Sequence, residues 1–455
     1  MKKILHSDFI IGLALTLVTL GAFFLHVDLF ESLELKTYDL RSHLRQTFKP
    51  ADEIAIVAID DDSIAKLGRW PWPRSFIAGG IDAITEAEAK VIGLNILFTE
   101  PERNEGLTEL RTLKEDIPPL FTAKQVLIKD KLIEMLSEAE VRLDNDTQLT
   151  DALLESKNVV LPMYFALGPS LGDEEPVLSS HTILQIDNPD AISQYPIVEG
   201  HSPAIPLDIF AEQAPAIGHV NTVPDSDGVV RSELPLLQFQ GDYYPSFSLQ
   251  MIRMFLNIPM EEISLKLGES VTVGRARIPI DANGRMLINF NGPVGTFPYY
   301  SFYDVINEKI DQAALKNKIV LVGHMATGIA DLNNTPIGGN FPGIEIVANV
   351  IQNILHQNFI TRPQWAHNAE LGLLIFVGLF ISLALPRLRA LAGTLISLVL
   401  FLGIAGAGTY FFVASGYWLK IFLPLILLLT GYLIITSKRF LMTEKKKELV
   451  EASAI

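Results

Sequence analysis

The apolar residues of this chain fall into long runs near its two ends and short runs in a polar middle segment. Four runs are long enough to cross about 30 Å of hydrocarbon at about 1.5 Å per helical residue. They lie at residues 9–27, 369–385, 391–413 and 419–436. The pattern therefore predicts four transmembrane helices and one large polar segment, residues 28–367, between the first and the second of them.

The first apolar run has an alternative interpretation, because it follows Met-Lys-Lys at the start of the chain, as a cleaved signal peptide would. The run is long for the apolar core of a signal peptide, and no convincing small-x-small cleavage site follows it. We therefore favour an uncleaved anchor. Glu370 is the one acidic residue in the four runs, and at the first turn of its helix it can stay at headgroup level, so we assign it no functional role.

Charge predicts how the segments are oriented. Basic residues gather beside the apolar runs at Lys2 and Lys3, at Arg387 and Arg389, and at residues 445–447. Because basic residues mark the cytoplasmic side of short loops, residues 1–8 and 437–455 are predicted to be cytoplasmic. The segment 28–367 is strongly acidic, with 26 Lys and Arg against 47 Asp and Glu. We expect it to lie outside the cytoplasm, and its charge argues against nucleic acid as a partner.

Short apolar runs within this middle segment predict an α/β fold. Residues 54–59 form a continuous run rich in β-branched residues, typical of a strand buried on both faces, and residues 91–98 form a second run. Between them, after the loop from Gly68 to Arg74, apolar residues recur at helical spacing from Ile77 to Ala87. The order strand, helix, strand predicts parallel strands with their loops at one edge of a sheet.

The rest of the segment extends this prediction to a mixed, largely parallel sheet with a β-meander part. Further predicted elements are strands at 159–163 and 318–323, helices at 246–256 and 343–356, and meander strands around Val271, Ile278 and Leu287. An acidic insertion from Pro101 to about Leu149, with a helix over 124–143, is expected to be a surface feature or lid. Residues 167–199 are expected to form a loop.

Two further segments are assigned structural roles. Residues 28–49 are predicted to be a helix that continues out of the membrane, and their alternating charges favour a solvated connector over a ligand site. Residues 218–239 are predicted to form a hairpin, with Asp227 and Gly228 in its turn. The Asp-x-Asp-Gly run could begin a calcium loop, but the helical flanks and the terminal Glu of such loops are missing, so we favour the turn and expect no metal.

Candidate ligand-binding residues follow from the predicted sheet, because ligands of open α/β sheets collect beyond the carboxyl ends of the strands. The residues expected there are Asp60, Asp61, Asp62, Arg74, Asn95, Gly323, His324 and Asp331. Arg74 could clamp an anion, or it could pair with Asp60 and fix the loop formed by Trp70, Pro71, Trp72 and Pro73. We favour the second, structural role for Arg74 and for this loop.

Catalysis and cofactor binding find no support in the sequence. It has no nucleophile elbow, zinc-protease helix, phosphate-binding loop or kinase signature, and its nine histidines are scattered without ligand spacing. The absence of cysteine removes disulfides and thiol chemistry. We therefore expect no catalytic residue, no metal and no cofactor within these 455 residues.

Several long motifs resemble one family. The IDDDS turn, the WPWPR loop and the GLNILF strand lie in the first part, and GHVNTVPDSDGVVRSELPL, INFNGP and KIVLVGHMATGIADLNNTPIGGNFPGIEIVANVIQNIL follow in the same order as in that family. Together they resemble the CHASE2 domain, an extracytoplasmic sensory module of bacterial signalling proteins, over about three quarters of the chain. One departure is Asn95, where the family more often carries an aspartate.

The resemblance implies a multi-pass receptor of the bacterial inner membrane with a periplasmic sensor, a homodimer, and an unknown extracytoplasmic ligand or envelope protein as partner. Relatives continue into a cytoplasmic cyclase, histidine kinase or serine/threonine kinase, and the helix-prone segment 437–455 is expected to begin a linker toward such an effector. A membrane scaffold that binds envelope proteins without signalling is the alternative. A hydrolase that uses the carboxylates of residues 60–62 is a weaker one.

Overall fold

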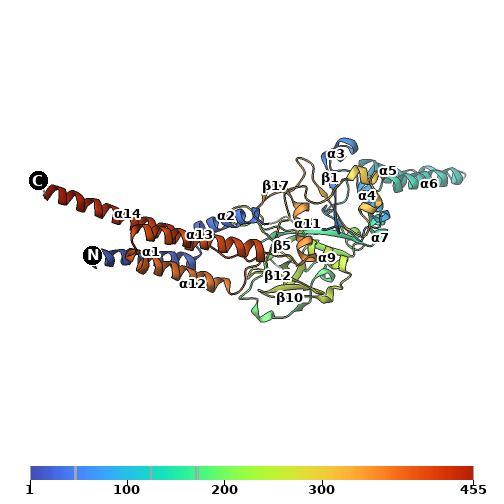
Figure 1. Cartoon of the computed structure of the whole chain (residues 1–455). Coiled ribbons are helices and arrows are strands. Elements are labelled where there is room, and N and C mark those ends of the chain that lie inside the picture. Colours follow the sequence, from blue (N-terminus) through green and yellow to red (C-terminus); the bar gives the residue numbers. More distant parts are fainter. Residues whose placement is uncertain (1, 46–48, 123–124, 170–171, 173, 454–455) are drawn as a thin grey trace. The chain divides into compact units, whose positions relative to one another are not determined.

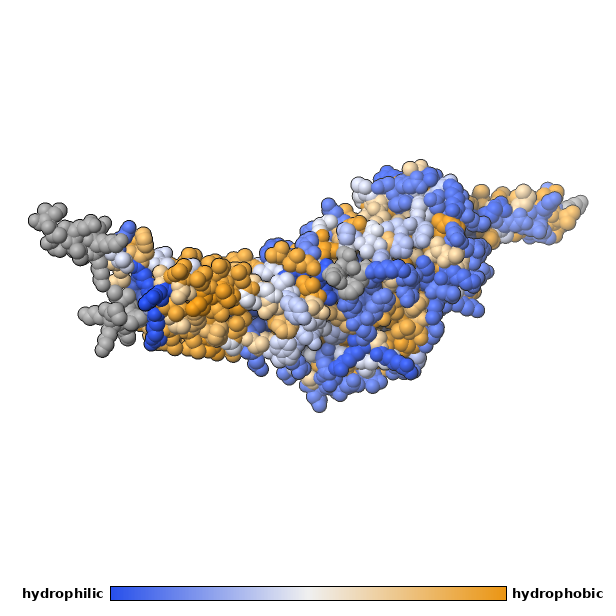
Figure 2. Space-filling model, in the orientation of Figure 1, coloured by the Kyte–Doolittle hydropathy of each residue, from blue (hydrophilic) through white to orange (hydrophobic). Residues whose placement is uncertain are grey.

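The computed structural model describes residues 2–45, 49–122, 125–169, 172 and 174–453. The chain divides into two compact units. The helical unit comprises residues 1–47, 225–229 and 359–455, and the α/β unit comprises residues 48–224 and 230–358. Figure 2 shows that the surface of the helical unit is largely hydrophobic, whereas that of the α/β unit is largely hydrophilic.

The α/β unit (Figure 1) is the part of the chain that carries the strands. It is built on a seven-stranded sheet in the order β14-β1-β15-β2-β3-β5, with β6 pairing with β3. Its strands are β1 Ile54–Ile59, β2 Val91–Leu94, β3 Val159–Leu167, β5 Gly200–Ala204, β6 Ala216–His219, β14 Tyr299–Ser301 and β15 Ile319–His324. Every described pairing in it is parallel except that of β5 with β3. The predicted fold class, with its mixed and largely parallel sheet, is thus confirmed.

Strand β15 lies between β1 and β2 and pairs with both. All six residues of β1 are buried, as the continuous apolar run predicts. The second predicted strand is shorter than expected and ends at Leu94. The amide of Asn95 still donates to the carbonyl of Val322 on β15 at 2.9 Å, and the chain leaves the ladder at Ile96, whose amide donates to the carbonyl of Leu94 at 2.9 Å.

Helices cover both faces of this sheet. On one face, α4 Arg74–Glu86 and α7 Asn145–Ser156 pack side by side and share a core with alternate residues of β1, β2 and β15. On the other face lie α9 Phe247–Leu256 and α11 Gly343–Leu355. Glycines allow their close approach, because a Cβ atom at Gly93 would lie 2.6 Å from Met251 and one at Gly323 2.9 Å from Ile344.

The polar face of α11 is buried as well as its apolar one. Glu345, Asn349 and Asn353 accept hydrogen bonds from backbone amides of the segment that leads to β14. The predicted helix is confirmed, but the apolar stripe alone did not reveal that its amides and its carboxylate hold a neighbouring loop.

Small sheets complete the unit, and one of them corrects the predicted extent of the meander. The meander is formed by β10 Ile263–Lys266, β11 Ser270–Val273 and β12 Ala276–Pro279, with β4 Gln185–Ile186 at its edge. Leu287 is not part of it, because β13 Met286–Leu287 pairs with β7 Ser232–Glu233. The remaining pairs are β8 Leu236–Phe239 with β9 Asp242–Pro245, and β16 Leu332–Thr335 with β17 Gly338–Pro342.

The predicted hairpin over residues 218–239 is wrong, because β6 pairs with β3 and β7 pairs with β13. The turn inside it is real. The amide of Gly228, at φ +77°, donates to the carbonyl of Asp225 at 2.8 Å, and the amide of Val229 donates to Asp227 Oδ1 at 3.2 Å. Aspartate and glycine are therefore needed for the turn itself and not for pairing its flanks.

The acidic insertion contains α5 Glu105–Asp116, a 3₁₀ turn Pro118–Leu120, and α6 Val126–Leu143. The predicted helix is confirmed over the described residues, while residues 123 and 124 lie outside them. Helix α6 has no buried residue, and Leu127 is 85% exposed. The insertion ends earlier than predicted, because Leu149, on α7, belongs to the core.

The loop predicted over 167–199 is mostly irregular where it is described. It also contains β4, the short 3₁₀ turns Ser179–His181 and Pro189–Ala191, and the end of β3. A short helix, α8 Asp208–Ala211, follows before β6, and a second, α3 Asp61–Leu67, follows β1. A further short helix of the α/β unit, α10 Phe302–Ile306, packs against α4.

Among its described residues, the helical unit has four helices that are long and apolar enough to cross a membrane by length and composition: Ser7–Leu25, Ala366–Arg387, Ala390–Ser415 and Phe422–Lys445. They belong to α1 Lys2–Leu25, α12 Ala366–Leu379 with a π-helical and a 3₁₀ extension, α13 Ala390–Ser415, and α14 Phe422–Ser453. Helix α14 continues through the segment that the sequence marked as helix-prone.

Small residues bring α1 and α12 together. A Cβ atom at Gly378 would lie 2.3 Å from Cγ2 of Thr16, and one at Gly12 would lie 2.7 Å from the hydroxyl of Ser382. Close approach at small residues is the usual basis of helix association in membranes, where no hydrophobic force pulls helices together.

The segment after α1 is not the solvated, continuous helix that was predicted. Helix α1 ends at Leu25, His26 has φ +49°, and a new helix, α2 Asp28–His43, begins. On α2, Glu34 and Arg41 are buried and form an ion pair at 2.6 Å. The alternation of charged residues along this segment therefore did not predict the buried ion pair of Glu34 and Arg41.

Glu34 and Glu370 hold the segment that precedes α14. Glu34 accepts hydrogen bonds from the amides of Ile421 and Phe422 at 2.9 and 2.8 Å and from Trp418 Nε1 at 3.2 Å. Burial raises the pKa of Glu34, while Arg41 and these donors oppose the rise. Glu370, to which no role was assigned, accepts from the amide of Lys420 at 2.8 Å and is a structural residue.

Candidate functional site

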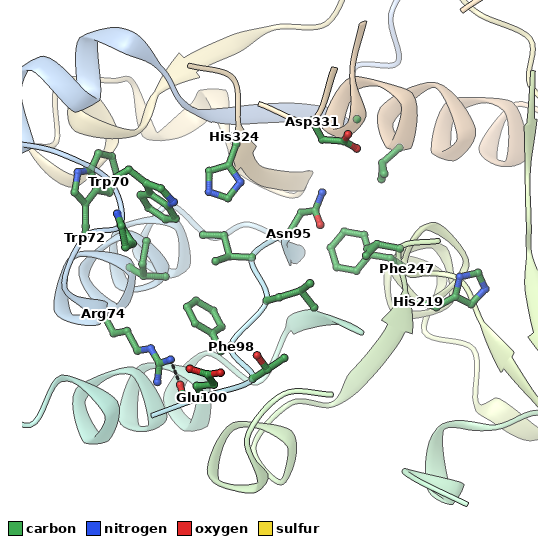
Figure 3. A pocket seen from close by; sticks show the side chains of 18 of the residues that line it. Trp70, Trp72, Arg74, Asn95, Phe98, Glu100, His219, Phe247, His324 and Asp331 are labelled. Atoms are coloured by element: carbon green, nitrogen blue, oxygen red, sulfur yellow. Dashed lines mark hydrogen bonds between the residues drawn. The ribbon is translucent and has the colours of Figure 1, made fainter. Parts of the chain in front are cut away.

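A cavity of about 800 Å³ lies at the carboxyl edge of the parallel strands of the α/β unit (Figure 3). Its walls come from the segments that follow β2, β6 and β15, from the Trp70 to Arg74 loop, and from the first turns of α9 and α11. All of these segments belong to one compact unit. The sequence prediction of a ligand crevice at this edge therefore coincides with a cavity of ligand-binding size.

The topology explains why the cavity opens here. The chain leaves β2 toward α7 on one face of the sheet, whereas it leaves β15 toward α11 on the other face. Neighbouring parallel strands whose connections diverge in this way leave a crevice between them. Asn95 follows β2 and His324 ends β15, so their side chains flank this crevice.

The loop from Trp70 to Pro73 forms an aromatic wall. Trp72 is buried, donates from Nε1 to the carbonyl of Gly68 at 2.7 Å, and packs on Phe302 at 5.4 Å between ring centroids. Trp70 contacts Trp72 edge-on at 5.2 Å and His324 at 4.6 Å. Trp72 thus anchors the loop in the core, while Trp70 presents part of its ring to the cavity.

Arg74 is held by protein groups at the cavity wall. Its guanidinium bonds to the carboxylate of Asp146 and to the carbonyl of Glu100, and it lies 5.2 Å from the ring centroids of both Phe98 and Phe210. The predicted pairing with Asp60 is wrong, because Asp146 on α7 takes that place. Arg74 ties the start of α4 to α7 and to the segment at Glu100, and its role in fixing the loop from Trp70 to Pro73 remains a prediction.

The three aspartates after β1 lie elsewhere. Asp60 caps α3 by accepting from the amide of Ser63 at 2.8 Å, and Asp61 accepts from the amide of Thr327 at 3.0 Å. Asp62 pairs with Lys66 at 2.6 Å on the exposed side of α3. None of them is among the described residues that line the cavity. Ligand binding by Asp60 and Asp61 remains a prediction.

Asn95, His324 and Asp331 all line the cavity. Burial lowers the pKa of His324, and its Nε2 atom has no hydrogen-bond partner among the described residues. Asp331 lies beside the first turn of α11, where a Cβ atom at Gly343 would come within 2.8 Å of its Oδ2 atom. A carboxylate suits this position, since the amino end of a helix carries partial positive charge.

Two residues that the sequence analysis missed complete the cavity wall. His219 ends β6 and is buried, and both of its ring nitrogens lack partners among the described residues. Burial lowers its pKa to about 3. Glu233 touches the cavity from β7. Burial raises its pKa to about 7, although the hydroxyls of Ser246 and Ser248 oppose this rise.

A signal for His219 was present in the sequence. It ends a strand of the parallel sheet, as His324 does, and the rule that selected His324 would have selected His219. The assignment of residues 218–239 to a hairpin concealed this. Glu233 carried no such signal, because only tertiary folding brings β7 to the cavity.

No metal centre is evident in the described part of the chain, where no three His, Asp or Glu side chains converge as ligands. The cavity instead combines aromatic walls with a few carboxylates, amides and neutral imidazoles. Such a lining suits a small organic molecule.

In the described part of the chain, an α/β unit with a cavity at its sheet edge accompanies four helices fit to cross a membrane, which is the architecture of a membrane protein with a folded domain outside the bilayer. A comparison with protein families identifies that domain, since the model of the CHASE2 domain matches residues 11–384. The chain belongs to the CHASE2 domain family, and its domain is an extracytoplasmic sensor domain. Neither the search of curated proteins nor that of solved structures found a match.

Proposed function

We propose that this protein is a transmembrane signal receptor of the bacterial inner membrane, whose cavity binds an extracytoplasmic cue. The observation that carries the proposal is the cavity of about 800 Å³ at the carboxyl edge of the sheet in a CHASE2 domain. The receptor passes the signal to a cytoplasmic effector, a cyclase, a histidine kinase or a serine/threonine kinase.

The distribution of charge supports this orientation. Lys438 and Arg439 on α14 pair with the buried Asp8 on α1 at 2.6 and 3.2 Å, and Arg387 and Arg389 lie in the turn before α13. Because basic residues favour the cytoplasmic side, this end of the helical unit faces the cytoplasm. The acidic α/β unit then lies outside.

The contacts inside the helical unit supply a route for the signal. Glu34 binds the backbone amides at the start of α14, and Glu370 near the start of α12 binds the amide of Lys420 just before it. A shift of α2 or α12 therefore pulls on the beginning of α14, which runs without a break to Ser453. A cue drives such a shift only as far as it binds one state better than the other.

The proposed receptor acts as a homodimer.

A chimera tests this function. The catalytic domain of an adenylate cyclase is fused after Ile455, and cyclic AMP is measured in cells. The substitution Val347→Trp places a large ring in the cavity from α11, and the control Val294→Trp changes an exposed residue outside it. We expect Val347→Trp to change the cyclic AMP level and Val294→Trp to leave it unchanged. Equal output from both folded variants would contradict the receptor.

The chimera also tests the route. Glu34→Gln removes the charge but keeps an acceptor for the amides before α14, so we expect it to weaken the response to Val347→Trp more than Glu31→Gln does. Glu31 is a suitable control because it lies on the same helix and pairs only with the side chain of Lys420 among the described contacts.

The exposed helix α6 favours a second function, a membrane scaffold. Its 18 residues include none that is buried, and Leu127 and Ile128 are 85% and 61% exposed. A scaffold would use this apolar surface to hold another envelope protein. It would also leave the chimera unresponsive to Val347→Trp, while Leu127→Glu would abolish capture of that partner.

A further inference from the structure

The cavity has charged groups that the fold already uses and charged groups that it leaves for a ligand. Arg74 is committed to Asp146, and Glu102 accepts from the amide of Arg74 at 2.8 Å and from Asn145 at 2.7 Å. These groups hold the wall together. Among the described lining residues there is no lysine, and the other arginine, Arg103, is exposed.

The groups left over are carboxylates and neutral imidazoles. Glu233 lines the cavity, and no ion pair to a cation is found for it in the described part of the chain. His219 is only 1% exposed, and its two ring nitrogens have no described partner although the residue lines the cavity. His324 likewise has an unpartnered Nε2 atom. Buried polar atoms without partners are rare in folded proteins, so these atoms indicate that a ligand completes the site.

The apolar part of the lining is aromatic. Trp70, Phe98 and Phe247 line the cavity from three different segments, and Figure 3 shows them around its centre, with Asn95 between them. The faces of aromatic rings attract cations, and indole does so most strongly. Rings and carboxylates together thus favour positive charge in this space.

We propose that the cavity binds a small organic amine, with its ammonium group at Glu233 and its apolar part against Trp70, Phe98 and Phe247. This assignment rests on the proposed receptor function and names the chemical class of its cue. In each neutral imidazole, at His219 and at His324, one ring nitrogen accepts a hydrogen bond, for example from an N–H group, and the other donates one. An organic acid would meet the carboxylates of Glu233 and Asp331, and of the two lining arginines Arg74 is committed to Asp146 while Arg103 is exposed to solvent.

The ionisation of Glu233 gives this recognition a measurable pH dependence. An ammonium group binds the ionised carboxylate, so affinity for an amine rises with pH until the pKa of Glu233, about 7, is passed. The titratable groups nearby do not mask this. His219 on β6 has a pKa of about 3, and burial lowers the pKa of His324. Ser246 and Ser248 lie at the start of α9, and Arg231 precedes Glu233 on its own segment.

The test uses matched probes on the full chain in nanodiscs. Tryptamine, tryptophol and indole-3-propionate share one ring and carry an amine, an alcohol and an acid. Phenethylamine, 2-phenylethanol and 3-phenylpropionate form a second set with a smaller ring. In at least one set, we expect the amine to bind about tenfold more tightly than the alcohol at pH 8, which equals about 1.4 kcal/mol, and the acid to bind least.

Glu233→Gln is expected to remove the preference for the amine over the alcohol and to flatten its rise between pH 6 and pH 8. The matched control is Glu212→Gln, an exposed residue outside the cavity, which is expected to behave as the native chain does. Thermal unfolding of both variants shows whether each has folded. If Glu233→Gln does not fold, two other measurements replace it. They are the preference of Asp331→Asn for the amine over the alcohol and the pH profile of amine binding to the native chain.

Each outcome decides the proposal. Equal binding of amine and alcohol, tighter binding of the acid, or no binding of either amine would overturn the amine assignment. So would a preference for the amine that survives Glu233→Gln. The receptor itself would stand in any of these cases if Val347→Trp still changed the output of the cyclase chimera.

Discussion

Replacing Arg74 by methionine should destabilise the α/β unit strongly, although the residue lies at the wall of a cavity. The change removes two charge-assisted hydrogen bonds, to Asp146 and to the carbonyl of Glu100. The carboxylate of Asp146, whose side chain is only 16% exposed, then loses the guanidinium that pairs with it. Hydrogen bonds to charged groups contribute about 1.5 to 3 kcal/mol each. The two ring contacts add about 1 kcal/mol, and methionine keeps most of the apolar packing.

At the lower end of these ranges the losses together amount to about 4 kcal/mol in the free energy of unfolding, which is already a large effect for a single substitution. The native chain and the variant would be unfolded by urea in detergent. The signal is tryptophan fluorescence, in a background where Trp365 and Trp418 are replaced by phenylalanine, so that Trp70 and Trp72 report. A double-mutant cycle with Asp146→Asn should give a coupling energy of about 2 kcal/mol.

Arg111 provides the matched control. It also binds two carboxylates, Glu140 and Asp144, but its side chain is 51% exposed. Because solvent screens such pairs, Arg111→Met should cost less than about 1 kcal/mol. If Arg74→Met cost no more than Arg111→Met, or if the coupling to Asp146 were absent, the assignment of Arg74 as the residue that fixes this wall would be refuted.

Two further predictions concern Glu233 and two glycines of the large sheet. The pKa of Glu233 rises from 4.5 to about 7 on folding, so the folded state binds its proton more tightly, and the free energy of unfolding should fall as pH rises through this window, by up to about 1.4 kcal/mol per pH unit. In Glu233→Gln that slope should vanish, which urea titrations at several pH values would show. Gly218→Ala should lower the free energy of unfolding by about 1 to 3 kcal/mol, because its Cβ atom would lie 2.7 Å from the backbone of Phe247. Gly93→Ala should lower it by less, because its Cβ atom would meet the flexible end of the Met251 side chain. Equal unfolding free energies for the two alanine variants would count against this packing.

Local patterns predicted the elements of the sheet well. The run from Ile54 to Ile59 is buried along its whole length, and the helical spacing after Arg74 marks α4. These signals are local because burial on both faces requires an uninterrupted apolar strand. These local signals do not predict the order of the strands in the sheet. Strand β15 enters between β1 and β2 although more than 200 residues separate it from both, and no local pattern encodes that pairing.

The same limit applies to the site. The rule that ligands gather at the carboxyl ends of strands found Asn95 and His324, since both follow strands that were predicted. It missed Glu233, which enters the cavity from a strand of another sheet. The partner of Arg74 was also missed, because Asp146 lies 72 residues away on a helix that seemed part of a surface insertion. Charge alone could not identify Glu34 either, whose burial depends on packing within the helical unit.

The orientation of the chain across the membrane is the claim on which the receptor depends, and single-cysteine labelling tests it most directly. The native sequence has no cysteine, so Ser193→Cys in the α/β unit and Thr443→Cys on α14 each create one exposed thiol. A membrane-impermeant maleimide is applied to intact spheroplasts and to lysed ones. The receptor predicts that Ser193→Cys is labelled in both and Thr443→Cys only after lysis. Labelling of Ser193→Cys only after lysis would contradict it.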